Sequence, residues 1–199
     1  MLYDGPPAAP GLRIGLLGGS FDPPHGGHVH ITHTALRTLQ LDRVWWLVTP
    51  GNPLKPHGPA DLKRRMAACH EMIQHPRVVI TDIESRLGSR FTADTLGALK
   101  NLYPHVRFVW LMGADNLVGF HHWERWDWIM ETVPIGVLAR PNAQVNAGLS
   151  PAAQRYAQFR APPQAAALLP FLDPPAWTLV TGPMSPLSST AIREKGEWP

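Results

Sequence analysis

Two histidines, three residues apart, follow a glycine-rich stretch near the N-terminus. The stretch reads Gly18-Gly19-Ser20-Phe21-Asp22-Pro23-Pro24, and His25-Gly26-Gly27-His28 comes directly after it. Glycines allow a sharp turn and a close approach of a ligand to the backbone. Residues three apart share one helix face, so a helix that begins near His25 would hold both imidazoles at the positive end of its dipole. The pattern predicts a turn that binds phosphate groups.

Two other interpretations of this stretch have to be weighed. His25, His28, His30 and His33 suggest a zinc site, but the chain has one cysteine and no downstream histidine and cysteine cluster at ligand spacing. We therefore expect no metal ligands. The second alternative is a purely structural turn. Two consecutive glycines in a first helical turn each cost about 1 kcal/mol relative to alanine, which indicates a local need for open backbone.

The segments around this turn alternate between strands and helices. Strands are expected at 11–17, 44–49, 78–82, 106–113, 135–139 and 177–181, and helices at 28–40, 60–75, 92–102, 116–121, 151–160 and 188–193. This alternation predicts an α/β fold, a single Rossmann-like domain over residues 1–199 with a doubly wound, mostly parallel sheet and a flexible segment at 1–10. Residues 141–175 are expected to be the least ordered, because prolines gather there. Ligands of such sheets bind beyond the carboxyl ends of the strands.

Composition and charge restrict the class of protein. Hydrophobic residues make up 44% of the 199, which is ordinary for a globular core, and no run of 18 apolar residues occurs. Residues 1–10 lack the basic and apolar regions of a signal peptide, so we expect a cytoplasmic protein with no membrane partner. The net charge of +3 suits an anionic substrate, but no basic and aromatic run indicates a nucleic-acid partner. Cys69 has helix-like apolar neighbours and is expected in the core.

The glycine-rich stretch and the histidine pair resemble a known signature. Gly18-Gly19-Ser20-Phe21-Asp22-Pro23 followed by His25-Gly26-Gly27-His28 is similar to the nucleotidyltransferase superfamily with the His-X-Gly-His motif, in the form typical of bacterial nicotinate-nucleotide adenylyltransferases. This motif alone leaves a phosphopantetheine adenylyltransferase or a cytidylyltransferase open. The resemblance extends over roughly residues 12–193, so the other segments decide between these families.

Three further segments resemble the parts of that family that hold ATP and phosphate. Pro50-Gly51-Asn52-Pro53-Leu54-Lys55-Pro56 is similar to a proline-rich loop that ends in a basic residue, which makes Lys55 a candidate phosphate contact. Gly113-Ala114-Asp115 follows a strand, where a carboxylate accepts hydrogen bonds from ribose hydroxyls or caps a helix. Ser188-Ser189-Thr190-Ala191-Ile192-Arg193 begins a helix, and its arginine presents a planar fork of donors to a phosphate. Arg64 and Arg65 follow the proline-rich loop, and their roles stay open.

Two segments resemble the part of the family that binds the nicotinate moiety. In Arg90-Phe91-Thr92, Thr92 is expected to cap a helix beginning at Ala93, whose free amides would meet a carboxylate. The family pattern is Ser-Tyr-Thr, so Phe91 lacks a hydroxyl, while Arg90 adds either a positive charge or an ordinary surface arginine. Trp123 matches the ring-stacking tryptophan, because an indole stacks on a pyridinium ring. Trp126 and Trp128 are interpreted as packing residues.

The resemblance implies adenylyl transfer from ATP to nicotinate mononucleotide in NAD biosynthesis, by direct in-line attack. In that mechanism the catalytic residues are His25, His28 and Arg193, and Mg²⁺ is carried by the ATP phosphates. The residues implied to bind the mononucleotide are Lys55, Phe91, Thr92 and Trp123. For Lys55, the resemblance implies a contact with either the mononucleotide or the triphosphate of ATP. The implied ATP contacts are Gly18, Gly19, Ser20, Phe21, His25, His28, Gly113, Asp115, Ser188, Ser189 and Arg193.

Two alternative functions stay open at this point. The nearer is an adenylyltransferase that uses nicotinamide mononucleotide, and the more distant is a nucleotide-binding module without catalysis. Intact His25, His28, Ser188 and Arg193 argue against the module, because a protein that only binds has less need of leaving-group contacts. The sequence leaves open whether the protein forms a homo-oligomer and how strictly it selects the acid over the amide. It also leaves open whether residues 162–175 become ordered on substrate binding and whether the chain is truncated at its C-terminal end.

Overall fold

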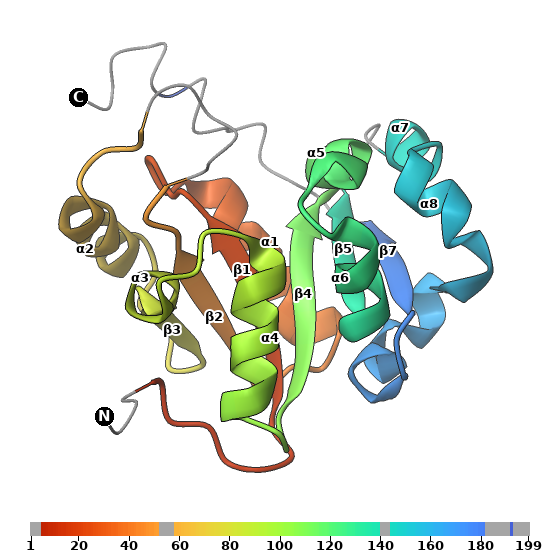
Figure 1. The fold of residues 1–199 in the computed structure, drawn as a ribbon, viewed down its shortest axis with the longest axis horizontal. Helices are drawn as coiled ribbons and strands as arrows, with labels where there is room; N and C mark the ends of the chain where they lie inside the picture. The colour runs from red at the N-terminus through yellow and green to blue at the C-terminus, as the bar shows by residue number, and fades with distance from the viewer. Residues whose placement is uncertain (1–4, 52–57, 140–143, 182–191, 193–199) are drawn as a thin grey trace.

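Seven parallel strands form one sheet in a computed structural model that describes residues 5–51, 58–139, 144–181 and 192 (Figure 1). The strand order across the sheet is β3-β2-β1-β4-β5-β7-β6. The strands are β1 (Arg13–Gly19), β2 (Arg43–Val48), β3 (Val78–Thr81), β4 (Arg107–Gly113), β5 (Ile135–Ala139), β6 (Arg160–Ala161) and β7 (Trp177–Thr181). The order changes direction at β1, which pairs with both β2 and β4, and this is where α/β sheets bind ligands.

Helices cover both faces of the sheet. They are α1 (Gly26–Thr38), α2 (Leu62–Met72), α3 (Ile83–Leu87), α4 (Thr92–Leu102), α5 (Ala114–Gly119), α6 (Trp126–Thr132), α7 (Gln144–Gly148) and α8 (Pro151–Arg155), with 3₁₀ turns η1 (Phe120–His122), η2 (Ala157–Phe159) and η3 (Pro163–Phe171). In Figure 1, α4 and α6 lie in front of the sheet and α1 lies behind it. Helices therefore cover both faces of the sheet at β1, so a ligand can approach this position at the carboxyl end of the strand.

Side chains from the same strand enter two separate cores on the two faces of the sheet. In β1, Ile14 and Leu16 pack with Leu96 of α4, whereas Leu17 packs with Leu36 of α1 on the opposite face. Successive side chains of a strand point to opposite faces, and a parallel sheet is buried on both. This explains why the strands are near-continuous apolar runs. Cys69 lies fully buried in the second core, as its neighbours in the sequence predicted.

The predicted fold class and all six predicted strands are confirmed, with boundaries that shift by a few residues. The helix expected at 28–40 begins at Gly26, because the His25 side chain accepts a hydrogen bond from the Gly27 amide and so caps it. The helix expected at 60–75 begins at Leu62, because Asp61 caps it, and ends at Met72, where Ile73 takes an extended conformation. The helix expected at 116–121 is α5, and the one expected at 188–193 lies outside the described residues except for Ile192.

The prediction that 141–175 is the least ordered stretch is wrong for its described part, residues 144–175. That part contains α7, α8, η2, β6 and η3, and the helix expected at 151–160 ends at Arg155. Ala166 and Leu169 of η3 are buried against the second core. Proline permits a 3₁₀ turn that begins with it, so a proline-rich composition did not mean an unpacked chain. Residues 5–10, predicted to be flexible, include two anchored carbonyls: Pro6 O accepts from Tyr103 Oη (3.0 Å) and Pro7 O from Arg43 Nη1 (2.8 Å).

Across the described ranges, none of the helices has both the length and the apolar character needed to cross a lipid bilayer.

Candidate active site

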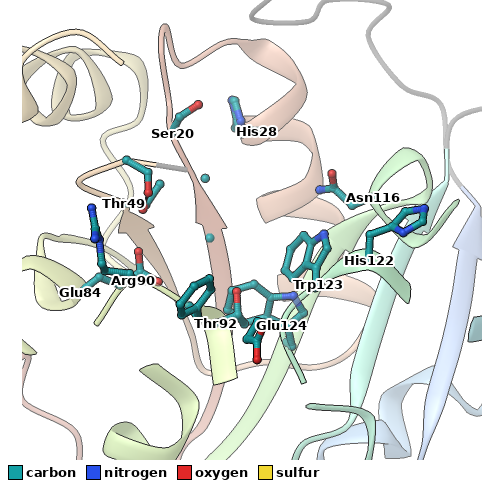
Figure 2. Close-up of a pocket in the computed structure, with 15 residues that line it drawn as sticks. Ser20, His28, Thr49, Glu84, Arg90, Thr92, Asn116, His122, Trp123 and Glu124 are labelled. Carbon is teal, nitrogen blue, oxygen red and sulfur yellow. Dashed lines mark hydrogen bonds between the residues drawn. The ribbon is translucent and has the colours of Figure 1, made fainter. Parts of the chain in front are cut away.

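A cavity of about 350 Å³ opens at the carboxyl ends of β1, β2 and β4 (Figure 2). One end carries Ser20 and His28, and the other carries Thr92, Trp123 and Glu124. The residues that line it come from strands, helices and the loops between them: Gly18, Gly19, Ser20, His28, Thr49, Gly51, Glu84, Arg90, Phe91, Thr92, Trp110, Asn116, His122, Trp123 and Glu124. The predicted phosphate turn and the predicted ring-binding segments therefore border one cavity.

Backbone amides fix the proton positions of the two motif histidines. The Gly27 amide donates to His25 Nδ1 (3.1 Å), and the His25 amide donates to His28 Nδ1 (3.2 Å). A ring nitrogen that accepts carries no proton, so a neutral ring holds its proton on Nε2. The motif spacing produces this arrangement, because His25 is the cap of α1 and His28 lies one turn into the helix. Each imidazole is thus set to donate from Nε2.

His28 is held in the neutral form. Its ring packs against Phe21 (centroids 4.6 Å apart) and His25 (4.0 Å). Burial, with the neighbouring His25 adding to it, lowers the pKa of His28 to about 3. The side chain is therefore a neutral hydrogen-bond donor at pH 7 and not a cation.

The sharp turn that we expected at Gly18 and Gly19 lies at Phe21 instead, although both glycines line the cavity. Gly18 and Gly19 end β1 in extended backbone, and the residue with a left-handed conformation in this stretch is Phe21, at φ 47°. Such a φ is strained for a bulky side chain. The Phe21 ring is held by stacking on Trp46 with centroids 4.8 Å apart. Phe21, predicted to contact ATP, is 1% exposed and lies beneath His28 rather than on the cavity wall.

Gly18 is needed because a neighbouring ring approaches it closely. A Cβ built there would lie 2.6 Å from Trp110 Cη2. Trp110 lines the cavity and meets Trp123 edge to face, with centroids 6.3 Å apart. Gly18 therefore makes room for the ring that supports Trp123.

The end of the cavity for which the sequence predicts ring binding is built on the start of α4 and the segment after α5. Thr92 is the first residue of α4, not its cap; the cap position is Phe91, whose side chain makes no capping bond, so that prediction is wrong. The first amides of a helix have no acceptor within it, which keeps them available for a carboxylate. Trp123 packs edge to face on Phe120, with centroids 5.3 Å apart, and lines the cavity. Trp126 and Trp128 pack against the core, as interpreted from the sequence.

A buried carboxylate that sequence reasoning missed also lines this cavity. Glu84 of α3 accepts a hydrogen bond from Thr95 Oγ1 (3.1 Å), and Thr95 in turn bonds to Ser89 Oγ (2.9 Å). Burial raises the pKa of Glu84, while hydrogen bonds from Thr95 and Thr49 oppose that rise. Gly88 ends α3 at φ 64°, a conformation that glycine adopts without strain, and turns the chain toward Ser89. A single glutamate near a strand end carries no sequence signal for such a network.

The remaining predicted residues fall in three groups. Arg90, whose role was left open, lines the cavity and is exposed. Gly113 caps α5 and Asp115 lies in its first turn, beside the lining residue Asn116 but not on the cavity wall. Lys55, Ser188, Ser189 and Arg193 lie outside the described residues. Thr49, His122 and Glu124 line the cavity without having been predicted, although each follows a strand or sits in the tryptophan-rich segment.

The comparisons with known proteins agree with this geometry. Residues 16–195 match the family described as cytidylyltransferase-like. A protein of Ruegeria pomeroyi is 61% identical over 97% of this chain and 91% of its own length. A protein of Cereibacter sphaeroides is 62% identical over 94% of this chain and its whole length. Both are named "Probable nicotinate-nucleotide adenylyltransferase".

Solved structures with the same fold include a more distant enzyme. The nicotinic acid mononucleotide adenylyltransferase of Plasmodium falciparum, complexed with NaAD, superposes with a TM-score of 0.70. The match covers 92% of this chain and 83% of that one, at 16% identity. At that identity the likeness shows the shared fold.

Proposed function

This chain belongs to the nicotinate-nucleotide adenylyltransferases within the cytidylyltransferase-like family, and on that premise we propose that it joins ATP and nicotinate mononucleotide into nicotinate adenine dinucleotide. The reaction releases pyrophosphate and makes the deamido form of NAD. The single observation that carries the proposal is the cavity itself. It has Ser20 and His28, which we assign to phosphate binding, and Thr92 and Trp123, which we assign to ring binding, on the wall of one space.

The chemistry follows from what the residues at each end do. An oxygen of the mononucleotide phosphate attacks the α-phosphorus of ATP, the bond from that phosphorus to the bridging oxygen breaks, and its electron pair leaves with pyrophosphate. The protein supplies no nucleophile, so its contribution is positioning and stabilisation of charge. The Nε2 protons of His25 and His28 are the donors that would meet the ATP phosphates and the charge on the bridging oxygen.

At the other end, the Trp123 indole is the surface for the pyridinium ring. That ring carries a positive charge in nicotinate mononucleotide, so a cation–π contribution adds to stacking. The first amides of α4, with Arg90 beside them on the cavity wall, are the donors that would favour an acid over an amide. Phe91 adds apolar surface at the same wall and no hydroxyl.

Mg²⁺ enters this proposal as part of the ATP substrate. Among the described residues that line the cavity, the carboxylates are Glu84 and Glu124, and both lie away from the Ser20 and His28 end. Imidazoles, hydroxyls and amides at that end suit phosphate oxygens, and Mg²⁺ prefers phosphates and water to such groups. We extend the proposal to Lys55, Ser188, Ser189 and Arg193 as further phosphate contacts, to Gly113 and Asp115 as ribose contacts, and to the cytoplasm as the place of the reaction.

Pyrophosphate release tests the proposal directly. The enzyme is mixed with Mg²⁺, ATP and either nicotinate or nicotinamide mononucleotide, and each dinucleotide is identified by mass. We expect a strong preference for the acid. Equal use of both would assign an enzyme of dual specificity, a preference for the amide would make it a nicotinamide enzyme, and no product from either would favour a binding module.

A further inference from the structure

One arginine that the sequence left without a role is fully buried beside the site. Arg65 is the fourth residue of α2, and only 1% of its surface is exposed. Its neighbour Arg64 is exposed on the same helix. Removing a guanidinium from water costs much solvation free energy, so a buried arginine needs hydrogen-bond partners that compensate for this cost.

The partners of Arg65 are backbone carbonyls from three separate places in the chain. Nη1 donates to Ser20 O (2.6 Å) and to Thr49 O (2.8 Å), and Nε donates to Ala60 O (2.7 Å). A longer contact joins Nη2 to Pro50 O (3.5 Å). Desolvation lowers the pKa of Arg65, and the nearby carboxylate of Asp22 opposes this. An arginine keeps its charge under such a shift, so the carbonyls accept charge-assisted bonds.

These carbonyls lie where the sheet can no longer hold the two loops together. The last paired residues of β1 and β2 are Gly19 and Val48, and one further bond runs from the Thr49 amide to Gly19 O (3.1 Å). Beyond it the chains diverge, one toward His25 and the other toward Gly51. Ser20, Thr49 and Gly51 all line the cavity. A single guanidinium nitrogen bridges the two loops just past the end of their strand pairing.

We propose that Arg65 is a positioning residue for adenylyl transfer, because it fixes the spacing between the Ser20 turn and the Thr49–Gly51 loop on the cavity wall. This inference rests on the proposed function. A change at Arg65 should affect the end of the cavity at Ser20 and His28, since the turn that begins at Ser20 continues to His25 and His28. Catalysis by positioning is sensitive to displacements of about 1 Å, so a loosened bridge should lower turnover more than it lowers stability.

The test replaces the guanidinium of Arg65 with an ammonium group, which keeps the positive charge but not the arrangement of the donors. Arg65→Lys has one nitrogen in place of three, so it cannot bond the Ala60 carbonyl and the two loop carbonyls from the separate nitrogens that Arg65 uses. Two controls accompany it: Arg64→Lys makes the same change at the exposed neighbour, and Ile73→Ala removes buried volume at the opposite end of α2. We measure kcat, the KM of each substrate and the urea midpoint of unfolding for all variants.

We expect Arg65→Lys to lower kcat at least about tenfold per folded molecule and to raise the KM of ATP. Arg64→Lys should stay within twofold of the parent, and so should the kcat of Ile73→Ala even with a lower urea midpoint. The proposal is overturned if Arg65→Lys keeps kcat within twofold, or if Ile73→Ala loses as much kcat at an equal shift in midpoint. If Arg65→Lys does not fold, Arg65→Gln is judged by the same criteria, and failure of both to fold overturns a role specific to the loops. An inactive parent enzyme would instead contradict the proposed function.

Discussion

At the scale of single residues, His28 presents a hydrogen-bond donor without charge to the cavity. His28 accepts the His25 amide on Nδ1 and is kept neutral by burial, so its donor is an Nε2–H bond of fixed direction. A charged imidazole would bind the triphosphate of the ground state tightly before any reaction. A neutral donor strengthens as charge develops on the leaving oxygen, which is the interaction that lowers a barrier.

The protonation state of His28 can be measured in the free protein. We expect its imidazole to remain neutral, with the proton on Nε2, from pH 5 to pH 8, because its pKa is about 3. Long-range ¹⁵N–¹H correlation spectra report both nitrogens, and the signals that disappear in His28→Ala assign the ring. A ring that titrates between pH 6 and pH 7 would contradict the geometry.

Removal of the same side chain should affect turnover far more than folding. His28→Ala deletes one oriented donor, and the expected loss is at least about a hundredfold in kcat, the range seen for a lost electrostatic donor. His33→Ala, an exposed histidine on the same helix, is the matched control and should leave kcat unchanged. A His28→Ala enzyme with nearly full turnover would remove His28 from the catalytic residues.

At the scale of elements, Glu84 links α3 to α4 through Thr95 and so holds the wall of the proposed ring-binding end. Because burial raises its pKa, the folded protein retains a proton there at pH values where the unfolded chain has released it. The free energy of unfolding therefore falls as pH rises from the ordinary glutamate pKa to the raised one, and it falls no further above that. The ionised Glu84 carboxylate therefore lowers the free energy of unfolding of the folded protein.

Glu84→Gln should remove this pH dependence. The variant has no proton to lose, so its free energy of unfolding relative to the parent should increase between pH 4 and pH 7. Urea unfolding at several pH values measures the difference. Thr95→Val should act in the opposite direction, since it deletes a hydroxyl that lowers the Glu84 pKa and so steepens the decline. A constant difference between Glu84→Gln and the parent at all pH values would refute this account.

The end of β1 offers a second prediction at this scale. Gly18→Ala places a methyl group 2.6 Å from the buried Trp110 ring, which cannot move away without displacing Trp123. We expect a loss of about 1–3 kcal/mol in the free energy of unfolding, the usual cost of overpacking, together with a higher KM for the mononucleotide. Gly119→Ala, where the added methyl meets nothing within 4 Å, is the control. Equal urea midpoints for the two variants would show that the ring yields freely.

At the scale of the whole molecule, the parts that could be predicted are those with a repeating pattern. The six predicted strands could be recognised because they read as apolar runs, as in residues 44–48, which are buried. The two-residue strand β6 has no such run and was not predicted. The segment at 144–175 could not, because its order comes from contacts such as that of Leu169 with the second core. Such contacts depend on the finished sheet and leave no period in the sequence.

The site shows the same division. His28, Thr92 and Trp123 were expected at the site from the motif resemblance, and all three line the cavity. Glu84 and Arg65 were not, because their importance lies in partners 11 to 45 residues away, such as Thr95 and the Ser20 carbonyl. In a sequence, a charged residue that the fold buries cannot be told from one that stays exposed, because its partners come from distant segments of the chain.

The arrangement of the cavity makes its two ends separable in binding. Trp123→Ala should raise the Kd of nicotinate mononucleotide about tenfold, since stacking on an indole is worth about 1–2 kcal/mol, and should leave the Kd of ATP within twofold. Isothermal titration calorimetry measures each substrate alone, with Trp128→Ala, which packs away from the cavity, as the control. If ATP lost as much affinity as the mononucleotide, Trp123 would be acting on the shape of the whole cavity. A loss of affinity confined to the mononucleotide would mean that the cavity at the carboxyl end of the sheet contains two independent subsites, one for each substrate.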